Sequence, residues 1–170
     1  FTNYRLKVEY RFVGNTAPGA PSWGYRDGGI QYHCQPPATV SLDQPFPICL
    51  EYNLLGGNGK DERPTGEICA SGIYVEIEGK RNTSYCTPPL VKRTFSGDQW
   101  VTADIEVRDG KVTHFVSGEQ IMQFENPRYD STNAIVKNLI AGDNLVRSGY
   151  ISIQSNSHPM DFRKIEILEY

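Results

Sequence analysis

The sequence has no long segment in which apolar residues recur at helical spacing. Apolar residues at every third or fourth position mark an amphipathic helix, so their absence excludes a helical bundle. Residues 133–140 are the one stretch that could form a helical turn, and they could equally form a strand or part of a long loop. No apolar run approaches the length of a membrane-spanning helix, so no membrane span is expected.

Positive charge is not concentrated anywhere in the chain. The 17 lysines and arginines are outnumbered by 20 aspartates and glutamates, which gives a net charge of −3 at pH 7. A surface that binds nucleic acid needs a dense basic patch, because the phosphate backbone supplies most of the attraction. The sequence therefore predicts that no nucleic acid is bound.

Familiar catalytic and cofactor-binding motifs are also missing. The chain contains no G-x-S-x-G, no H-E-x-x-H, no P-loop and no dinucleotide-binding fingerprint. None of its cysteines occurs in a C-x-x-C or C-x-x-H pair, so a structural zinc site is not expected.

The four cysteines allow three disulfide pairings, and sequence alone does not select one. We favour Cys69 with Cys86, because this bond would join the ends of a hairpin that runs out through Val75 and returns from Tyr85. Disulfides persist in oxidising compartments, so this interpretation predicts a secreted or periplasmic protein. The alternative is four buried free thiols in a cytosolic protein.

The sequence does contain many short segments of alternating apolar and polar residues, rich in aromatic and β-branched side chains. They are separated by turns that draw on 16 glycines and 11 prolines. Short strands with such turns predict an all-β sandwich of two antiparallel sheets, in one domain that spans residues 1–170. The expected strands are residues 4–13, 28–35, 48–55, 73–78, 82–86, 99–108, 111–117, 121–125, 150–154 and 162–168.

Polar side chains stand at alternating positions of several expected strands, and we predict that they share one sheet face. Together they would suit a saccharide, whose hydroxyls need donors and acceptors in fixed places, and Trp23 or Trp100 could stack on a sugar ring. The alternative is a solvated sheet face with the aromatic residues in the core. The candidates are Glu9, Arg11, Gln31, His33, Gln35, Glu51, Asn53, Gln154 and Arg163.

The three histidines differ in how strongly the sequence favours a role in the site. His33 lies between Gln31 and Gln35 on a strand, which favours the polar face. His158 stands in a turn, near Gln154 and Arg163 in the sequence, and histidines in such turns are usually structural. His114 alternates in phase with valines and is expected to be packed. The carboxylates could form surface ion pairs, act as bases or bind a hard cation such as Ca²⁺.

Four segments resemble the 3-keto-disaccharide hydrolase family: residues 4–12 (YRLKVEYRF), 28–33 (GGIQYH), 47–57 (PICLEYNLLGG) and the tail from Gly149. Residues 63–66 (RPTG), Cys69 and residues 97–102 (GDQWVT) resemble a bacterial subgroup common in polysaccharide-degrading organisms. The resemblance spans essentially the whole chain. It implies a concanavalin A-like jelly roll that acts on a carbohydrate. Family members usually have further strands before the first segment, so we expect this chain to be the main part of a somewhat longer protein.

The family is associated with cleaving glycosides that a partner dehydrogenase has already oxidised at C3. A 3-ketone acidifies the C2 hydrogen, so a base can form an enediolate that expels the aglycone from C1 before water adds back. This chemistry needs a base and an electrophile, either a side-chain cation or a metal. By position, the resemblance implies Glu51 or His33 as base and Arg11 or Arg163 as charge stabiliser. It implies that the sugar is bound by Glu9, Gln35, Asn53, Gln154 and His158.

Two features keep other interpretations open. Cys34 and Cys49 stand where the family leads us to expect small hydroxyl residues, and a second disulfide between them could lie near the cleft. Concanavalin A-like sandwiches also include carbohydrate-binding modules and lectin-like domains, so a non-catalytic sugar-binding module is the alternative function. A third interpretation, a structural or adhesion domain, predicts an apolar patch and no cleft.

Overall fold

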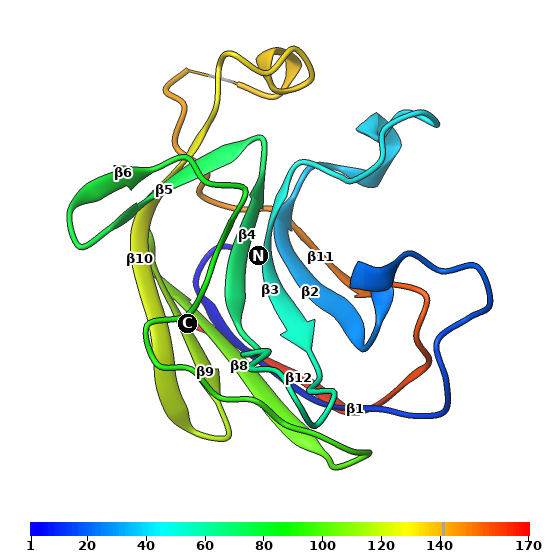
Figure 1. The fold of residues 1–170 in the computed structure, drawn as a ribbon. Coiled ribbons are helices and arrows are strands. Elements are labelled where there is room, and N and C mark those ends of the chain that lie inside the picture. Colours follow the sequence, from blue (N-terminus) through cyan, green and yellow to red (C-terminus); the bar gives the residue numbers. More distant parts are fainter. Residues whose placement is uncertain (141) are drawn as a thin grey trace.

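The protein is a sandwich of two antiparallel β-sheets, as the sequence predicts (Figure 1). The computed structural model describes residues 1–140 and 142–170. Sheet A has the strand order β12-β1-β8-β9-β10-β5-β6, and sheet B has the order β11-β2-β3-β4-β7. Pairing of strands far apart in the sequence, such as β1 with both β12 and β8, gives the sandwich its jelly-roll character.

The strand bounds agree with most of the expected segments. Three segments differ. β4 follows the loop that ends at Gly66 and was not predicted, and β10 continues well beyond residue 125. The strand expected at residues 82–86 is not formed, since β6 ends at Asn82 and β7 begins at Cys86. The strands of sheet A are β12 (Met160–Glu169), β1 (Tyr4–Phe12), β8 (Val101–Arg108), β9 (Lys111–Val116), β10 (Glu119–Tyr129), β5 (Ile73–Ile77) and β6 (Lys80–Asn82). Those of sheet B are β11 (Tyr150–Ser155), β2 (Asp27–Cys34), β3 (Cys49–Leu55), β4 (Glu67–Ser71) and β7 (Cys86–Thr87).

The core lies between the sheets, and the period-2 alternation of the strands builds it. On β1, Tyr4 to Phe12 alternate between buried residues that face sheet B and charged residues that face outward. On β3, Leu50, Tyr52 and Leu54 are fully buried from the other side. His114 lies among them, as expected for a packed histidine: its Nε2 is 2.7 Å from the Tyr32 hydroxyl and its Nδ1 is 3.2 Å from the Gly66 carbonyl oxygen.

The favoured disulfide is present. Cys69 on β4 is bonded to Cys86 on the two-residue strand β7, with a Cα–Cα distance of 4.0 Å. Cys34 and Cys49 are buried free thiols, so the second disulfide that the sequence allowed is not formed. The bond therefore fixes the outermost strand of sheet B to its neighbour.

Helical structure in the described residues is confined to three short 3-10 turns: η1 (Ser22–Gly24), η2 (Pro37–Thr39) and η3 (Val136–Asn138). η3 falls within residues 133–140, where the sequence allowed a helical turn. The described part of the chain has no helix long and apolar enough to cross a membrane. The loops that carry η1 and η2 rise beside β2, β3 and β11, on the side of sheet B that faces away from sheet A (Figure 1).

Candidate functional site

Two rows of cross-strand partners build the outer face of sheet B. Directly paired residues of adjacent strands lie about 5 Å apart and point to the same side, so each row places its side chains next to one another. One row consists of Ser152, Gln31, Glu51, Cys69 and Cys86. The next consists of Gln154, Gly29, Asn53 and Glu67.

A missing side chain in the second row determines where the Glu51 carboxyl group lies. Gly29 pairs with Asn53 on one side and with Gln154 on the other. A Cβ atom at Gly29 would lie 2.6 Å from Glu51 Oε1, so the carboxyl group fills the space above this glycine. Glycine at this position therefore lets Glu51 reach from its own row into the next one.

These rows form the floor of a cavity of about 340 Å³, which falls within the size range of small-molecule sites. Its rim is aromatic: Trp23 and Tyr85 are each 55 % exposed. The lining residues are Trp23, Asp27, Phe46, Glu51, Asn53, Cys69, Tyr85, Cys86, Gln154 and Asn156. The cavity thus combines aromatic walls with a floor of carboxyl and amide groups.

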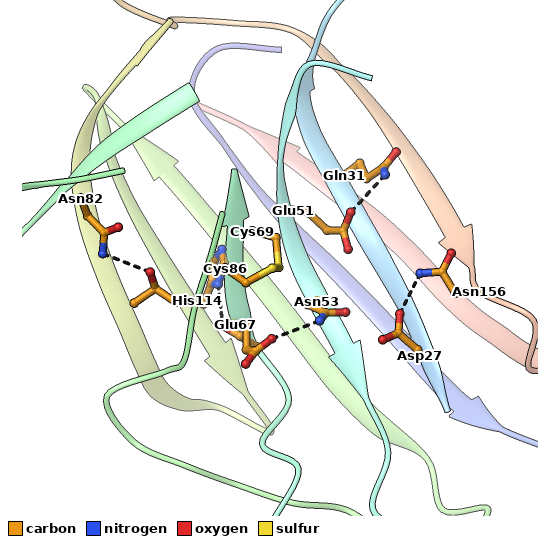
Figure 2. The surroundings of a disulfide bond; sticks show 12 residues. Asp27, Gln31, Glu51, Asn53, Glu67, Cys69, Asn82, Cys86, His114 and Asn156 are labelled. Carbon is orange, nitrogen blue, oxygen red and sulfur yellow. Dashed lines mark hydrogen bonds between the residues drawn. A yellow bond between two sulfur atoms is a disulfide. The ribbon is translucent and has the colours of Figure 1, made fainter. Parts of the chain in front are cut away.

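Hydrogen bonds orient the Glu51 carboxyl group (Figure 2). Gln31 Nε2 donates to Glu51 Oε2 at 3.1 Å, and Ser152 Oγ donates to Gln31 Oε1 at 2.8 Å, which fixes the Gln31 amide. Burial raises the pKa of Glu51 to about 7, and the nearby Asp27 carboxylate adds to this effect. A carboxyl group with such a pKa exchanges protons near neutral pH.

Hydrogen bonds also hold the neighbouring polar groups of the cavity lining. Asn156 Nδ2 donates to Asp27 Oδ1 at 2.7 Å, and burial raises the pKa of Asp27. Asn53 Nδ2 donates to Glu67 Oε2 at 3.2 Å, which turns Asn53 Oδ1 away from Glu67. Asn53 Oδ1 and Gln154 Oε1 are both buried without a hydrogen-bond partner.

The structure brings Glu51, Asn53 and Gln154 together in this cavity. It separates them from Glu9, Arg11 and Arg163, so the prediction that all these residues share one face is wrong. The reason is that β1 and β12 belong to sheet A, where Tyr10 and Phe12 take the inward positions and turn the charged residues outward.

The charged residues of sheet A form a cluster of their own around Trp100. The guanidinium carbons of Arg11 and Arg163 lie 4.7 and 4.1 Å from the centre of the Trp100 ring. Arg163 Nε donates to Glu9 Oε2 at 2.6 Å, and Arg11 pairs with Asp161 at 2.7 Å. The core of the sandwich lies between this cluster and the cavity on sheet B.

His33 is also placed elsewhere, because β2 is irregular at this residue. His33 has a φ of 49°, and the register between β2 and β11 shifts here, which marks a β-bulge. The extra residue breaks the alternation from Gln31, and the ring lies 6.1 Å from that of Tyr4 and lines a different cavity of about 270 Å³. Burial lowers the pKa of His33 to about 4. The expectation of His33 beside Glu51 is therefore wrong.

Gln35 and His158 hold loops in place. Gln35 Oε1 accepts from the Ile48 backbone N–H at 2.7 Å and from Gln44 Nε2 at 2.8 Å, which ties down the loop that contains η2. His158 is 2 % exposed, and its Nδ1 is 2.8 Å from Thr16 Oγ1. Neither lines the cavity on sheet B, so the structure does not bring them together with Glu51.

Sequence reasoning missed four lining residues: Asp27, Phe46, Tyr85 and Asn156. Asp27 had a usable signal, since it alternates in phase with Gly29 and Gln31, but the strand was expected to begin one residue later. The other three lie outside the expected strands or at their ends. Among the described residues, Glu67, Cys69 and Cys86 place ligand atoms within 4.8 Å of one another, but the two sulfurs form a disulfide and are not thiolate ligands.

Comparison with known proteins identifies relatives of this architecture. The family model for the 3-keto-alpha-glucoside-1,2-lyase-like domain matches residues 1–168. No curated protein sequence matches the chain significantly. Two solved structures from Parabacteroides distasonis, each named a "putative glycosyl hydrolase", share the fold. One has 13 % identity and a TM-score of 0.59, and the alignment covers 100 % of this chain and 79 % of the other. The second has 16 % identity and a TM-score of 0.53, with 100 % and 73 % covered.

A carbohydrate-binding module from Bacillus subtilis, CBM66, aligns with 7 % identity and a TM-score of 0.49. The alignment covers all of this chain and 76 % of that one.

Proposed function

Because the chain belongs to the 3-keto-alpha-glucoside-1,2-lyase-like domain family, we propose that the cavity on sheet B binds a saccharide and cleaves its glycosidic bond next to a C3 ketone. The observation that carries the proposal is the Glu51 carboxyl group, which lies over Gly29 on the cavity floor, below two exposed aromatic rings.

The lining of the cavity suits a sugar. The faces of Trp23 and Tyr85 can pack against the C–H side of a pyranose ring, as aromatic rings do with apolar surfaces. Asn53 Oδ1 and Gln154 Oε1 are acceptors without a donor, and a sugar hydroxyl would supply one. A bound sugar would therefore satisfy groups that the protein alone leaves unpaired.

In the proposed reaction, Glu51 is the base. Its carboxylate takes the C2 proton, and the C–H electrons form the enediolate that the C3 ketone stabilises. The enediolate then breaks the C1–O bond, the aglycone leaves with the bonding electrons and takes up a proton, and water adds to the remaining double bond. The ketone must be formed beforehand, so the proposal implies that a sugar dehydrogenase acts earlier.

A second candidate function is supported by the rim of the cavity. Trp23 and Tyr85 are more than half exposed, a feature that also suits a non-catalytic sugar-binding module. For either function we place the protein in a secreted or periplasmic location, because the Cys69–Cys86 disulfide requires an oxidising compartment.

The test is aglycone release from a 3-keto-glycoside, measured beside the same glycoside without the ketone. Cleavage of the keto compound alone supports the proposal. Binding of both sugars by calorimetry without any release would support the sugar-binding module. Loss of that binding in Trp23→Ala would place it in this cavity, with Trp100→Ala on sheet A as the matched control.

A further inference from the structure

A second carboxyl group lies beside that of Glu51 in the cavity on sheet B. Asp27 stands two residues before Gly29 on β2, so its side chain points to the same face of the sheet. Residues spaced in this way are about 6.6 Å apart along a strand, and the Glu51 carboxyl group fills the space above Gly29. Both side chains line the cavity. The two carboxyl groups can therefore face neighbouring parts of one ligand.

Hydrogen bonds hold Asp27 in place and leave one of its oxygens available. The residue is only 9 % exposed. Asn156 Nδ2 donates to Asp27 Oδ1 at 2.7 Å, and the Asn156 backbone N–H donates to the Asp27 carbonyl oxygen at 3.0 Å (Figure 2). In the described part of the chain, no side chain donates to Asp27 Oδ2. One carboxylate oxygen is thus fixed, and the other can act on a ligand.

The two carboxyl groups differ in when they ionise. Burial raises the pKa of Asp27, while the hydrogen bond from Asn156 and the positive charge of Arg63 oppose this rise. Burial raises the pKa of Glu51 to about 7, and the Asp27 carboxylate adds to this effect. Because the charge of Asp27 contributes to the rise at Glu51, Asp27 is ionised at the pH where Glu51 titrates. Asp27 is thus a carboxylate while Glu51 holds a proton.

The proposed reaction removes two protons. Glu51 takes the first from C2, and the second leaves water when its oxygen bonds to C1 of the unsaturated ketone that remains after cleavage. A positioned base speeds such a proton transfer by about 10²–10⁴-fold. Glu51 already holds the C2 proton at this stage, so a second base is needed.

Few groups in the cavity could be that base. Of the described residues that line it, Cys69 and Cys86 are bonded to each other, and only Asp27, Glu51 and Tyr85 carry groups that titrate. Burial raises the pKa of Tyr85 above its ordinary value of 10, so its hydroxyl keeps its proton at neutral pH. Asp27 alone combines the right charge with a free oxygen.

We propose that Asp27 is a second catalytic residue, the base that activates water in the second half of the reaction. This inference rests on the proposed function. Asp27 takes a proton from water, and the water oxygen forms a bond to C1. The C1=C2 electron pair moves toward the C3 ketone to form an enediolate, and Glu51 returns its proton to C2. Asp27 then releases its proton to solvent, which balances the proton that the aglycone took up.

The test follows both products of a 3-keto-glycoside, the aglycone and the hydrated 3-keto sugar. The wild type should form them in equal amounts. Asp27→Asn keeps an acceptor for Asn156 but cannot take a proton. We expect it to form the hydrated sugar at least about 10²-fold more slowly than the aglycone, so that the unsaturated ketone accumulates and is seen by mass spectrometry. Asp161→Asn on sheet A is the matched control and should hydrate the ketone fully.

A second variant separates a base from a structural residue. Azide adds to C1 without losing a proton, so it does not need a base. We expect Asp27→Ala in the presence of azide to convert the accumulated ketone to the 1-azido sugar, with the melting temperature showing that the variant is folded.

The inference is overturned if folded Asp27→Asn hydrates the ketone as fast as it releases the aglycone, or if azide leaves the products of Asp27→Ala unchanged. A loss of aglycone release as large as the loss of hydration would also overturn it, because that would place Asp27 in the cleavage step. In each of these cases the wild type still cleaves the keto-glycoside and the proposed function stands. Failure of the wild type to release any aglycone would instead contradict the proposed function itself.

Discussion

At the scale of single residues, two adjacent glycines on β2 differ in what they permit. A Cβ at Gly29 would meet the flexible end of Glu51, whereas a Cβ at Gly28 would lie 2.7 Å from the Gln154 backbone oxygen and 2.6 Å from the Met160 sulfur. A side chain can move aside more easily than a strand can. Gly29 therefore positions the Glu51 carboxyl group, whereas Gly28 allows the backbone of β11 to approach β2 closely.

We predict that Gly29→Ala displaces the Glu51 carboxyl group and lowers turnover of a keto-glycoside about tenfold or more, because small misplacements of a reacting group are costly. Gly28→Ala should instead lower the stability of the fold by about 1–3 kcal/mol, since it introduces strain against the backbone. Thermal melting and turnover of the two variants, measured together, check this contrast. Equal activity of Gly29→Ala and the wild type would contradict the positioning role.

His114 makes stability depend on pH. Its burial lowers the pKa from 6.5 to about 4, so the unfolded chain binds a proton between these values and the folded protein does not. The contribution of His114 to stability is therefore complete above pH 6.5 and falls as the pH drops toward 4, by up to about 3 kcal/mol. Urea unfolding at a series of pH values should show this slope, and His114→Gln should reduce it to the part that the buried His33 supplies. An unchanged slope in the variant would contradict this assignment.

At the scale of elements, the β-bulge at His33 turns this side chain away from the cavity on sheet B. A non-glycine residue at a φ of 49° is uncommon, and asparagine tolerates this conformation better than most residues. We predict that His33→Asn folds and keeps turnover, because the ring lies outside the cavity on sheet B. His33→Ala should lose about 1 kcal/mol of stability or more through backbone strain. A large loss of turnover in a well-folded His33→Asn would restore the histidine as a base.

The disulfide holds β7, which is only two residues long, against β4. Its cysteines are 17 residues apart, and closing such a loop stabilises a protein by about 3 kcal/mol. We predict that the double variant Cys69→Ala, Cys86→Ala unfolds at a correspondingly lower urea concentration. It should also bind sugar more weakly, because Tyr85 directly precedes Cys86. The single variant Cys34→Ala, which breaks no disulfide, is the control for the loss of a cysteine. Equal stability of the double variant and the wild type would show that packing alone holds β7.

At the scale of the whole molecule, the sequence predicted the sandwich well because alternation is a local property. Residues 4–12 show which side chains share a face of β1, and the structure keeps that pattern. Alternation does not show which sheet a strand joins, and this is why Arg11 was expected beside Glu51. The same limit applies to Arg163. A bulge is equally hidden in the sequence, which explains the error at His33.

The strand β12 forms one edge of sheet A and leaves apolar side chains exposed there. Ile165 and Ile167 on β12 pair with Val8 and Leu6, which face the core, yet they are 56 % and 39 % exposed. Their side chains therefore lie at an open margin between the sheets. That further strands accompany this domain in a longer protein stays a prediction.

The central claim is that Glu51 acts as the base in the cavity on sheet B, and the most direct measurement is turnover of a 3-keto-glycoside by Glu51→Gln. We predict a loss of at least about 10²-fold, which is typical when a general base is removed, with unchanged melting and retained sugar binding. Glu119 is an exposed carboxylate at the start of β10 and pairs with Arg93, so Glu119→Gln should keep full turnover. Full activity of a folded Glu51→Gln would contradict the account.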